Sequence, residues 1–192
     1  MKILTISGSL RARSSNTELL RAAQLVADPS WTFDHYDGLA SLPPFSPDHA
    51  FEGATPPEPV RDLRARIAAA DALLISSPEY AHGVPGSLKN ALDWMVSDAA
   101  MLGKPIVLLN ASARSTFAHP QLAETLRTMS TELVTEASLV VPLDGRRLDA
   151  AGIAADPALA PQLRTALDAL AAVVFRRGGS SDPPDQALSP KP

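Results

Sequence analysis

The sequence predicts an α/β fold in which one parallel sheet lies between two layers of helices. Short apolar runs alternate with stretches of helical spacing about five times along the chain. The runs are nearly continuous, which indicates strands that are buried on both faces, as in parallel sheets. The length of 192 residues fits a single domain, since domains commonly have about 100–200 residues.

Five segments are expected to form the strands. Four are apolar runs, at residues 3–6, 72–75, 105–109 and 139–143. The other, residues 31–36, alternates apolar and polar side chains and is the weakest of the set. Right-handed crossovers between such strands place helices on both faces of the sheet. Ligands of doubly wound sheets bind beyond the carboxyl ends of the strands, so the residues after each run are candidate site residues.

Apolar residues three and four positions apart predict the helices. The first two helical faces comprise Leu19, Ala22, Ala23 and Val26, and Leu88, Ala91, Leu92 and Met95. A later helix begins after Asp156 and Pro157, which are an N-cap residue and a proline at the first helical position. Its apolar stripe comprises Leu159, Leu163, Leu167, Leu170 and Val174.

Prolines mark two segments outside these elements. The cluster within residues 43–59 predicts a long loop inside the domain. The second cluster belongs to residues 177–192, which are rich in Gly, Ser, Pro and Asp. Such a composition buries too little apolar surface to offset the entropy of ordering. We therefore expect one domain over residues 1–176, followed by a disordered tail.

The composition excludes several functional classes. The chain has no cysteine, which excludes disulfides, thiol catalysis and cysteine-ligated clusters. Its four histidines have no metal-ligand spacing, so no metal site is expected. The formal charge of −4 gives no reason to expect nucleic acid or an anionic membrane as a partner. The lack of cysteine and of a long apolar segment predicts a cytoplasmic protein.

The loop after the first strand is a candidate anion site. Residues 8–16, GSLRARSSN, contain three serines, one asparagine and two arginines directly before a predicted helix. Free N–H groups and the helix dipole favour an anion at this place. A small phosphomonoester fits the loop, although an ordinary Ser- and Asn-rich turn would have the same composition. Neither G-x-G-x-x-G nor G-x-x-x-x-G-K-[ST] occurs, so this loop does not indicate a dinucleotide pyrophosphate or a nucleoside triphosphate.

The loop after the third predicted strand is a candidate site for a flat ligand. Residues 76–87 contain two prolines and two glycines, which make the backbone stiff. A stiff loop can bind the polar edge of a planar ring through its N–H groups. Glu79, Tyr80 and His82 can equally be surface or packing residues, and this alternative stays open.

Two motifs in these loops resemble those of one protein family. Residues 8–16 match G-S-L-R-x-x-S-x-N, and residues 77–94 match S-P-E-Y-N-x-x-x-P-G-x-L-K-N-A-x-D-W at all but one fixed position. This ordered pair is similar to the NADPH-dependent FMN reductase family, which includes quinone, chromate and azo-dye reductases. The resemblance extends over roughly residues 1–175.

The resemblance implies a flavodoxin-like three-layer sandwich, whose five-stranded parallel sheet has the order 2-1-3-4-5. It also implies FMN as the cofactor and NADPH or NADH as the electron donor. The residues that it assigns to the FMN phosphate are Ser9, Arg11, Ser14, Ser15 and Asn16. Those that it assigns to the isoalloxazine ring are Pro78, Glu79, Tyr80, Ala81 and Gly83.

The resemblance further implies a homodimer or homotetramer with the flavin near a subunit boundary. The helix that carries Asn90, Asp93 and Trp94 would help to build the dimer. Trp94 can equally be a buried aromatic residue in the core of one chain.

Two places depart from the family pattern. Ala81 stands where the family usually has Asn, so a ring contact there must come from the backbone. Residues 110–116, NASARST, replace a turn that is often rich in glycine. We expect their side chains to crowd the ring or to replace backbone contacts with hydroxyls, of which Ser112 is the candidate. Arg114 could meet the 2′-phosphate of NADPH or be an ordinary exposed arginine.

These observations predict an FMN-dependent NAD(P)H oxidoreductase. It would pass hydride from NAD(P)H through bound FMN to free flavin, a quinone or a similar small electrophile. No side chain is needed as an acid or base, because the flavin supplies the chemistry. The alternatives are a non-enzymatic flavodoxin-like electron carrier, a flavin-binding or sensing module, and a family member that has lost its flavin.

Overall fold

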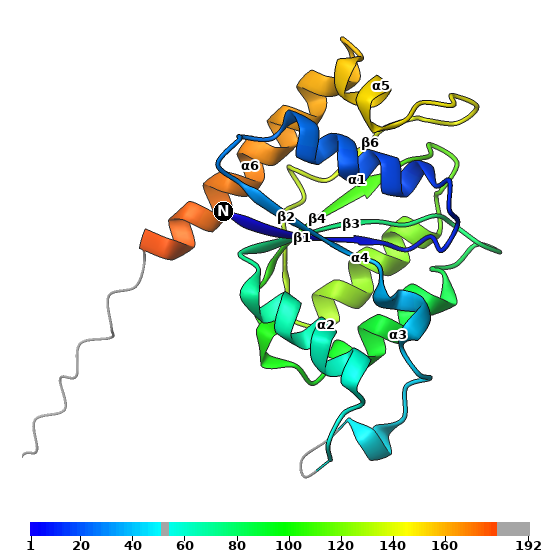
Figure 1. Ribbon diagram of the computed structural model, residues 1–192, viewed down its shortest axis with the longest axis vertical. Coiled ribbons are helices and arrows are strands. Elements are labelled where there is room, and N and C mark those ends of the chain that lie inside the picture. The colour runs from blue at the N-terminus through cyan, green and yellow to red at the C-terminus, as the bar shows by residue number, and fades with distance from the viewer. Residues whose placement is uncertain (51–53, 180–192) are drawn as a thin grey trace, which may run out of the picture.

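The computed structural model describes residues 1–50 and 54–179 and confirms the three-layer α/β architecture (Figure 1). A parallel sheet has the strand order β2-β1-β3-β4-β5, and β6 also pairs with β4. The strands are β1 (Lys2–Ser7), β2 (Thr32–Tyr36), β3 (Ala72–Ser76), β4 (Pro105–Asn110), β5 (Glu132–Leu133) and β6 (Leu139–Val140).

Helices cover both faces of the sheet (Figure 1). One face carries α1 (Ser15–Val26), α5 (Ala150–Ala155) and α6 (Leu159–Gly179). The other carries α2 (Glu58–Ala69), α3 (Gly86–Met95) and α4 (Ala118–Thr128). Short 3-10 helices lie in the connections: η1 (Gly38–Ser41), η2 (Pro47–His49) and η3 (Ala99–Met101).

The central strands are apolar along their whole length because each face of the sheet has its own core. Leu73 and Ile75 of β3 pack with α2, α3 and α4, whereas Leu74 packs with α1 and α6. All residues of β3 and β4 are buried. Burial of each large aliphatic side chain stabilises the fold by about 1.5–3 kcal/mol.

The predicted strand at residues 139–143 is shorter than expected, and the sheet edge is divided. Both β5 and β6 pair with β4, and a turn separates them. The Ser138 hydroxyl explains the interruption: Leu108 N–H donates to it at 3.1 Å, and it donates to Val134 O at 3.0 Å. A side-chain oxygen thus replaces a ladder bond of the edge strand. Beyond β6, Val141 N–H donates to Asn110 O at 2.7 Å, so the chain continues beside β4.

The predicted helical faces are buried except at Val174, which is partly buried, and the end of the domain is helical. Asp156 caps the start of α6, where its Oδ1 accepts from the N–H groups of Ala158 and Leu159 at 2.9 and 3.1 Å. This helix continues to Gly179, so it includes the first residues of the predicted tail. The rest of that tail, residues 180–192, lies outside the described residues, as do residues 51–53 of the proline-rich loop. In the described part of the chain, no helix has the length and apolar character of a membrane span.

Candidate functional site

A cleft of about 810 Å³ lies where the central strands end. The loops that follow β1, β3 and β4 line it, together with residues 143–147 after β6. Parallel register brings these loops together, because Ser7 pairs with Ser76 and Ser76 pairs with Leu109. The strand order reverses between β1 and β3, which is the usual place for a ligand in such a sheet. The volume is typical of cofactor sites, which range over about 300–1,000 Å³.

The first wall of the cleft is the loop that enters α1. Ser14 is the N-cap of this helix, and it makes no capping hydrogen bond with its side chain. The first N–H groups of α1 therefore stay available for a ligand. Asn16 is buried at the same place, and its Oδ1 accepts from Ser76 Oγ at 2.8 Å. Its Nδ2 group is then the donor that Asn16 can offer.

The entry to this loop depends on a glycine. Gly8 N–H donates to Ser76 O at 2.8 Å, so the chain stays against β3 for one residue beyond β1. A Cβ at Gly8 would lie 2.6 Å from Ser77 Oγ, which is too close for any other residue without a shift. The glycine at the start of the first motif thus allows the loops after β1 and β3 to touch.

The second wall contains a tight hairpin. Tyr80 N–H donates to Gly83 O at 3.1 Å, and Gly83 N–H donates to Tyr80 O at 3.0 Å. The two residues between them, Ala81 and His82, have φ angles of +50° and +60°. Such a turn favours Asn and Gly, because other side chains are strained in the left-handed region. The left-handed backbone at residue 81 therefore gives a physical reason why the family usually has Asn at this position.

Glu79 joins this hairpin to the start of α4. Its Oε2 accepts from the N–H groups of Phe117 and Ala118, both at 2.8 Å. The Ala118 N–H, followed by that of Phe117, lowers the pKa of Glu79. His82 stacks on Phe117 with 4.2 Å between ring centroids, and Gln121 Nε2 donates to His82 O at 3.1 Å. Glu79 lines the cleft, but its carboxylate serves as a cap for α4.

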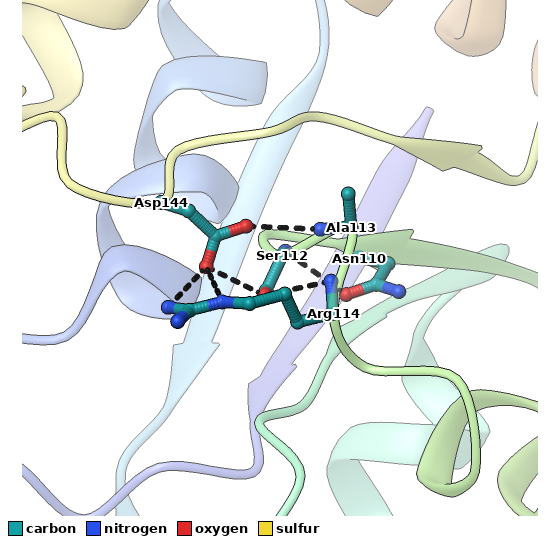
Figure 2. Close-up of polar contacts among 5 residues, drawn as sticks. All are labelled: Asn110, Ser112, Ala113, Arg114 and Asp144. Atoms are coloured by element: carbon teal, nitrogen blue, oxygen red, sulfur yellow. Dashed lines mark hydrogen bonds and ion pairs between the residues drawn. The ribbon is translucent and has the colours of Figure 1, made fainter.

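Figure 2 shows the third wall, where Asp144 holds the loop after β4. Asp144 Oδ1 accepts from Ser112 Oγ at 2.7 Å and from Arg114 Nε and Nη2 at 3.1 and 2.9 Å. Its Oδ2 accepts from Ala113 N–H at 3.1 Å. The Ser112 hydroxyl makes the largest contribution to the lowered pKa of Asp144, and Arg114 adds to it.

The backbone of this loop already uses its donors within the chain. Ser112 N–H donates to Asn110 Oδ1 at 3.0 Å, and Arg114 N–H donates to Ser112 Oγ at 3.2 Å. The next two N–H groups, of Ser115 and Thr116, donate to carbonyls of the loop itself. Ser115 Oγ is buried in the cleft wall, where it adds to the lowering of the pKa of Glu79. The loop thus offers a ligand few free backbone donors.

Most residues predicted from the sequence lie together in the cleft. Those that line it are Ser9, Arg11, Ser14, Ser15, Asn16, Pro78, Glu79, Tyr80 and Ser112. Ala81 and Gly83 do not line it, and they lie in the adjoining hairpin. The hydroxyl of Ser112 donates to Asp144, so that bond would have to break before Ser112 could donate to a ring.

Sequence reasoning missed the fourth wall, residues 143–147. Asp144, Arg146 and Arg147 line the cleft from this segment. The predicted strand at 139–143 carried the signal, because residues directly after a strand of a parallel sheet are candidate site residues.

Two residues of the second motif make contacts within their own chain. Trp94 is fully buried, and its Nε1 donates to Pro43 O at 2.8 Å. Asn90 Nδ2 donates to the same oxygen at 3.0 Å, and Asn90 Oδ1 accepts from Phe45 N–H at 2.8 Å. Phe45 packs edge-on against Trp94. These side chains therefore fix the loop before η2 to α3.

The donor set of the cleft fits FMN. The open N–H groups of α1, with the serines and Arg11 beside them, suit a phosphate dianion. Tyr80, which the short hairpin to Gly83 holds in the cleft wall, suits a planar ring.

Comparisons with known proteins agree with this chemistry. The family model described as NADPH-dependent FMN reductase matches residues 1–145. A 2-hydroxy-1,4-benzoquinone reductase of a Burkholderia species is 32% identical over 183 residues, which are 92% of this chain and 98% of that protein. An NAD(P)H-dependent FMN reductase of Pseudomonas aeruginosa is 38% identical over 115 residues, or 59% of this chain and 60% of that protein.

A solved structure shows the same fold. FerB, a flavoenzyme NAD(P)H:(acceptor) oxidoreductase from Paracoccus denitrificans, superposes with a TM-score of 0.73 at 26% identity. The match covers 91% of this chain and 97% of FerB.

Proposed function

The chain belongs to the NADPH-dependent FMN reductase family, and on this premise we propose that its cleft holds FMN between an NAD(P)H donor and a quinone-type acceptor. The protein is thus an FMN-dependent NAD(P)H oxidoreductase with the flavodoxin-like fold. One observation supports the placement most strongly: the uncapped N-terminus of α1 opens into the same cleft as the rigid hairpin after β3.

The residues of the first wall would hold the phosphate. Ser9, Ser14, Ser15 and Asn16 surround the N-terminus of α1, and Arg11 adds a positive charge. Hydrogen bonds to a charged group contribute about 1.5–3 kcal/mol each, so a few such bonds account for tight binding. The α1 dipole favours the same dianion.

The second wall would position the ring. Pro78 and Tyr80 would form the surface, the turn from Ala81 to Gly83 would stiffen it from outside the cleft, and Glu79 fixes it to α4. FMN supplies the redox chemistry when it is bound. The chain binds and orients its ligands, and no side chain is assigned as an acid or base.

The acceptor class follows from the relatives. One relative is named for 2-hydroxy-1,4-benzoquinone, and FerB is named only for an unspecified acceptor. We propose a small quinone for this chain. Since one cleft would serve both substrates, the oxidised donor must leave before the acceptor enters.

A homodimer or homotetramer belongs to the same proposal. Large apolar side chains around the cleft support it: Leu10, Tyr80 and Phe117 are 58%, 51% and 50% exposed. Exposed apolar groups next to a site are typical of surfaces that a partner covers. Sedimentation of the FMN-loaded protein would test the state of assembly. The cytoplasmic location stays a prediction from the cysteine-free composition.

The test of function is NADPH oxidation with 1,4-benzoquinone, measured with and without added FMN. We expect quinone-dependent oxidation that requires FMN. An electron carrier or a sensing module would bind FMN without oxidising NADPH, and a chain that has lost flavin would show neither property.

A further inference from the structure

The cleft has more positive charge than FMN requires. Five arginines line it, against the two carboxylates of Glu79 and Asp144. The chain as a whole has a formal charge of −4, so the excess of positive charge is local to the cleft. A cleft lined by one sign of charge attracts ligands of the opposite sign.

Two of these arginines already have carboxylate partners. Arg114 pairs with Asp144, with Nη2 and Oδ1 2.9 Å apart, and Arg146 pairs with Asp156. For Arg11, Arg13 and Arg147, no ion pair or guanidinium hydrogen bond exists within residues 1–50 and 54–179. Arg11 belongs to the phosphate site proposed above, which leaves Arg13 and Arg147 without a function.

The segment that carries Arg147 is fixed at both ends. On one side, Leu143 N–H donates to Ala111 O at 3.1 Å, and Asp144 holds the 112–114 turn. On the other, Ala150 N–H donates to Glu18 Oε2 of α1 at 2.8 Å. Arg147 therefore starts from a defined backbone at the rim, although its own side chain is exposed. It also lies beyond residues 1–145, the segment that the family model matches.

We propose that Arg13 and Arg147 form a second anion site in the cleft, which binds the phosphate groups of the dinucleotide donor and favours the additional 2′-phosphate of NADPH over NADH. This inference rests on the proposed function. A substrate that binds at these arginines must carry an anionic group and must enter the cleft when FMN is already bound. The donor is the assigned source because every pyridine dinucleotide carries phosphates, whereas a simple quinone is neutral.

The test uses the full-length, FMN-loaded protein with the substitutions Arg13→Gln, Arg147→Gln and both together. Arg164→Gln on α6 is the matched control, since Arg164 is exposed and does not line the cleft. Because the oxidised donor leaves the cleft before the acceptor enters, kcat/KM for the donor and kcat/KM for the acceptor can be measured separately. NADP⁺ and NAD⁺ binding by calorimetry gives a second readout that does not depend on turnover.

We expect the double variant to lower kcat/KM for NADPH about tenfold or more, the size of one lost charge-assisted contact, and to lower that for NADH less. NADP⁺ binding should weaken in parallel, while FMN retention after dialysis and kcat/KM for 1,4-benzoquinone stay unchanged. The Arg164→Gln protein should behave as the parent.

Three results would overturn the inference. If the ratio of kcat/KM for NADPH to kcat/KM for NADH and the affinity for NADP⁺ were both unchanged in the double variant, the two arginines would not form a second anion site. Loss of FMN from the variants would assign the arginines to the cofactor. A selective loss with 2-hydroxy-1,4-benzoquinone, but not with its neutral 2-methoxy analogue, would assign the site to an anionic acceptor. A parent protein that oxidises neither NADPH nor NADH would contradict the proposed function instead, and the calorimetric comparison would still test the arginines.

Discussion

Single carboxylates determine the shape of the cleft. Glu79 accepts two N–H groups at the start of α4, and Asp144 accepts from a hydroxyl, an N–H and a guanidinium of the loop after β4. These hydrogen bonds use one oxygen of Glu79 and both oxygens of Asp144. Their role is to fix neighbouring loops, which agrees with a reaction whose chemistry the cofactor supplies.

At Ala81, the φ of +50° predicts that Ala81→Asn stabilises the protein. A left-handed alanine is strained, and Asn tolerates this region, so we expect a gain of about 0.5–1 kcal/mol. Thermal unfolding should show a Tm higher by about 1–4 °C. The control is Ala172→Asn on the exposed side of α6, where Asn should lower stability because of its helix propensity. A decrease at both positions would contradict the strained conformation of residue 81.

At Trp94, the structure predicts a core role rather than a subunit contact. Trp94→Phe removes the hydrogen bond to Pro43 O and leaves a small cavity, so the free energy of unfolding should fall by about 1–3 kcal/mol. The loss should be the same at low and high protein concentration in urea titrations. Trp31→Phe, at a partly exposed position, should cost less. A loss that varies with protein concentration would place Trp94 at an interface.

At the scale of elements, the loop after β4 should respond to acid. The Ser112 hydroxyl and Arg114 lower the pKa of Asp144 below the ordinary value of 3.8, so the folded state binds this proton less readily than the unfolded chain. The stability from this contact is therefore complete above about pH 5 and is lost as the pH falls through the lowered pKa.

Urea unfolding between about pH 2 and pH 6 measures this contribution. Asp144→Asn should make stability less dependent on pH in this range. Asp168→Asn is the control, since Asp168 is exposed on α6 and does not line the cleft. Equal pH dependence in the parent and Asp144→Asn would show that the carboxylate does not hold the loop.

The strands β1 to β4 and the helices α1, α3 and α6 could be predicted from the sequence because their signals are local, whereas α2, α4, α5 and β5 were not predicted individually. The buried faces of α1 and α3 and the apolar runs of β1, β3 and β4 follow from periodicity alone. The edge strand could not be predicted in detail, because Ser138 interrupts it through contacts with other segments. The loops of the cleft were found by their place after strands, and this rule also applies to Asp144.

The contacts inside the cleft required the structure. Glu79 lies 38 residues before Phe117, and Ala113 lies 31 residues before Asp144. No local pattern shows that a carboxylate will cap a distant helix or accept from a distant loop. For the same reason, the sequence indicated Ser112 as a hydroxyl donor but did not show that this hydroxyl donates to Asp144.

At the scale of the whole molecule, one topological feature places the site. The strand order β2-β1-β3-β4-β5 brings the loops after β1 and β3 together, although about one βαβ segment separates them in the chain. The two sequence motifs thus become two walls of one cleft. Arginine-rich loops then give this cleft a local charge opposite to that of the chain.

The most direct test is a calorimetric comparison of FMN with riboflavin, which lacks only the phosphate. We expect FMN to bind at least about tenfold more tightly, because hydrogen bonds to a charged group are worth about 1.5–3 kcal/mol each. Arg11→Ala should weaken FMN binding strongly and riboflavin binding little, with activity restored by excess FMN. Equal affinities for the two flavins, or an Arg11→Ala protein that binds FMN as tightly as the parent, would contradict a phosphate site at the start of α1.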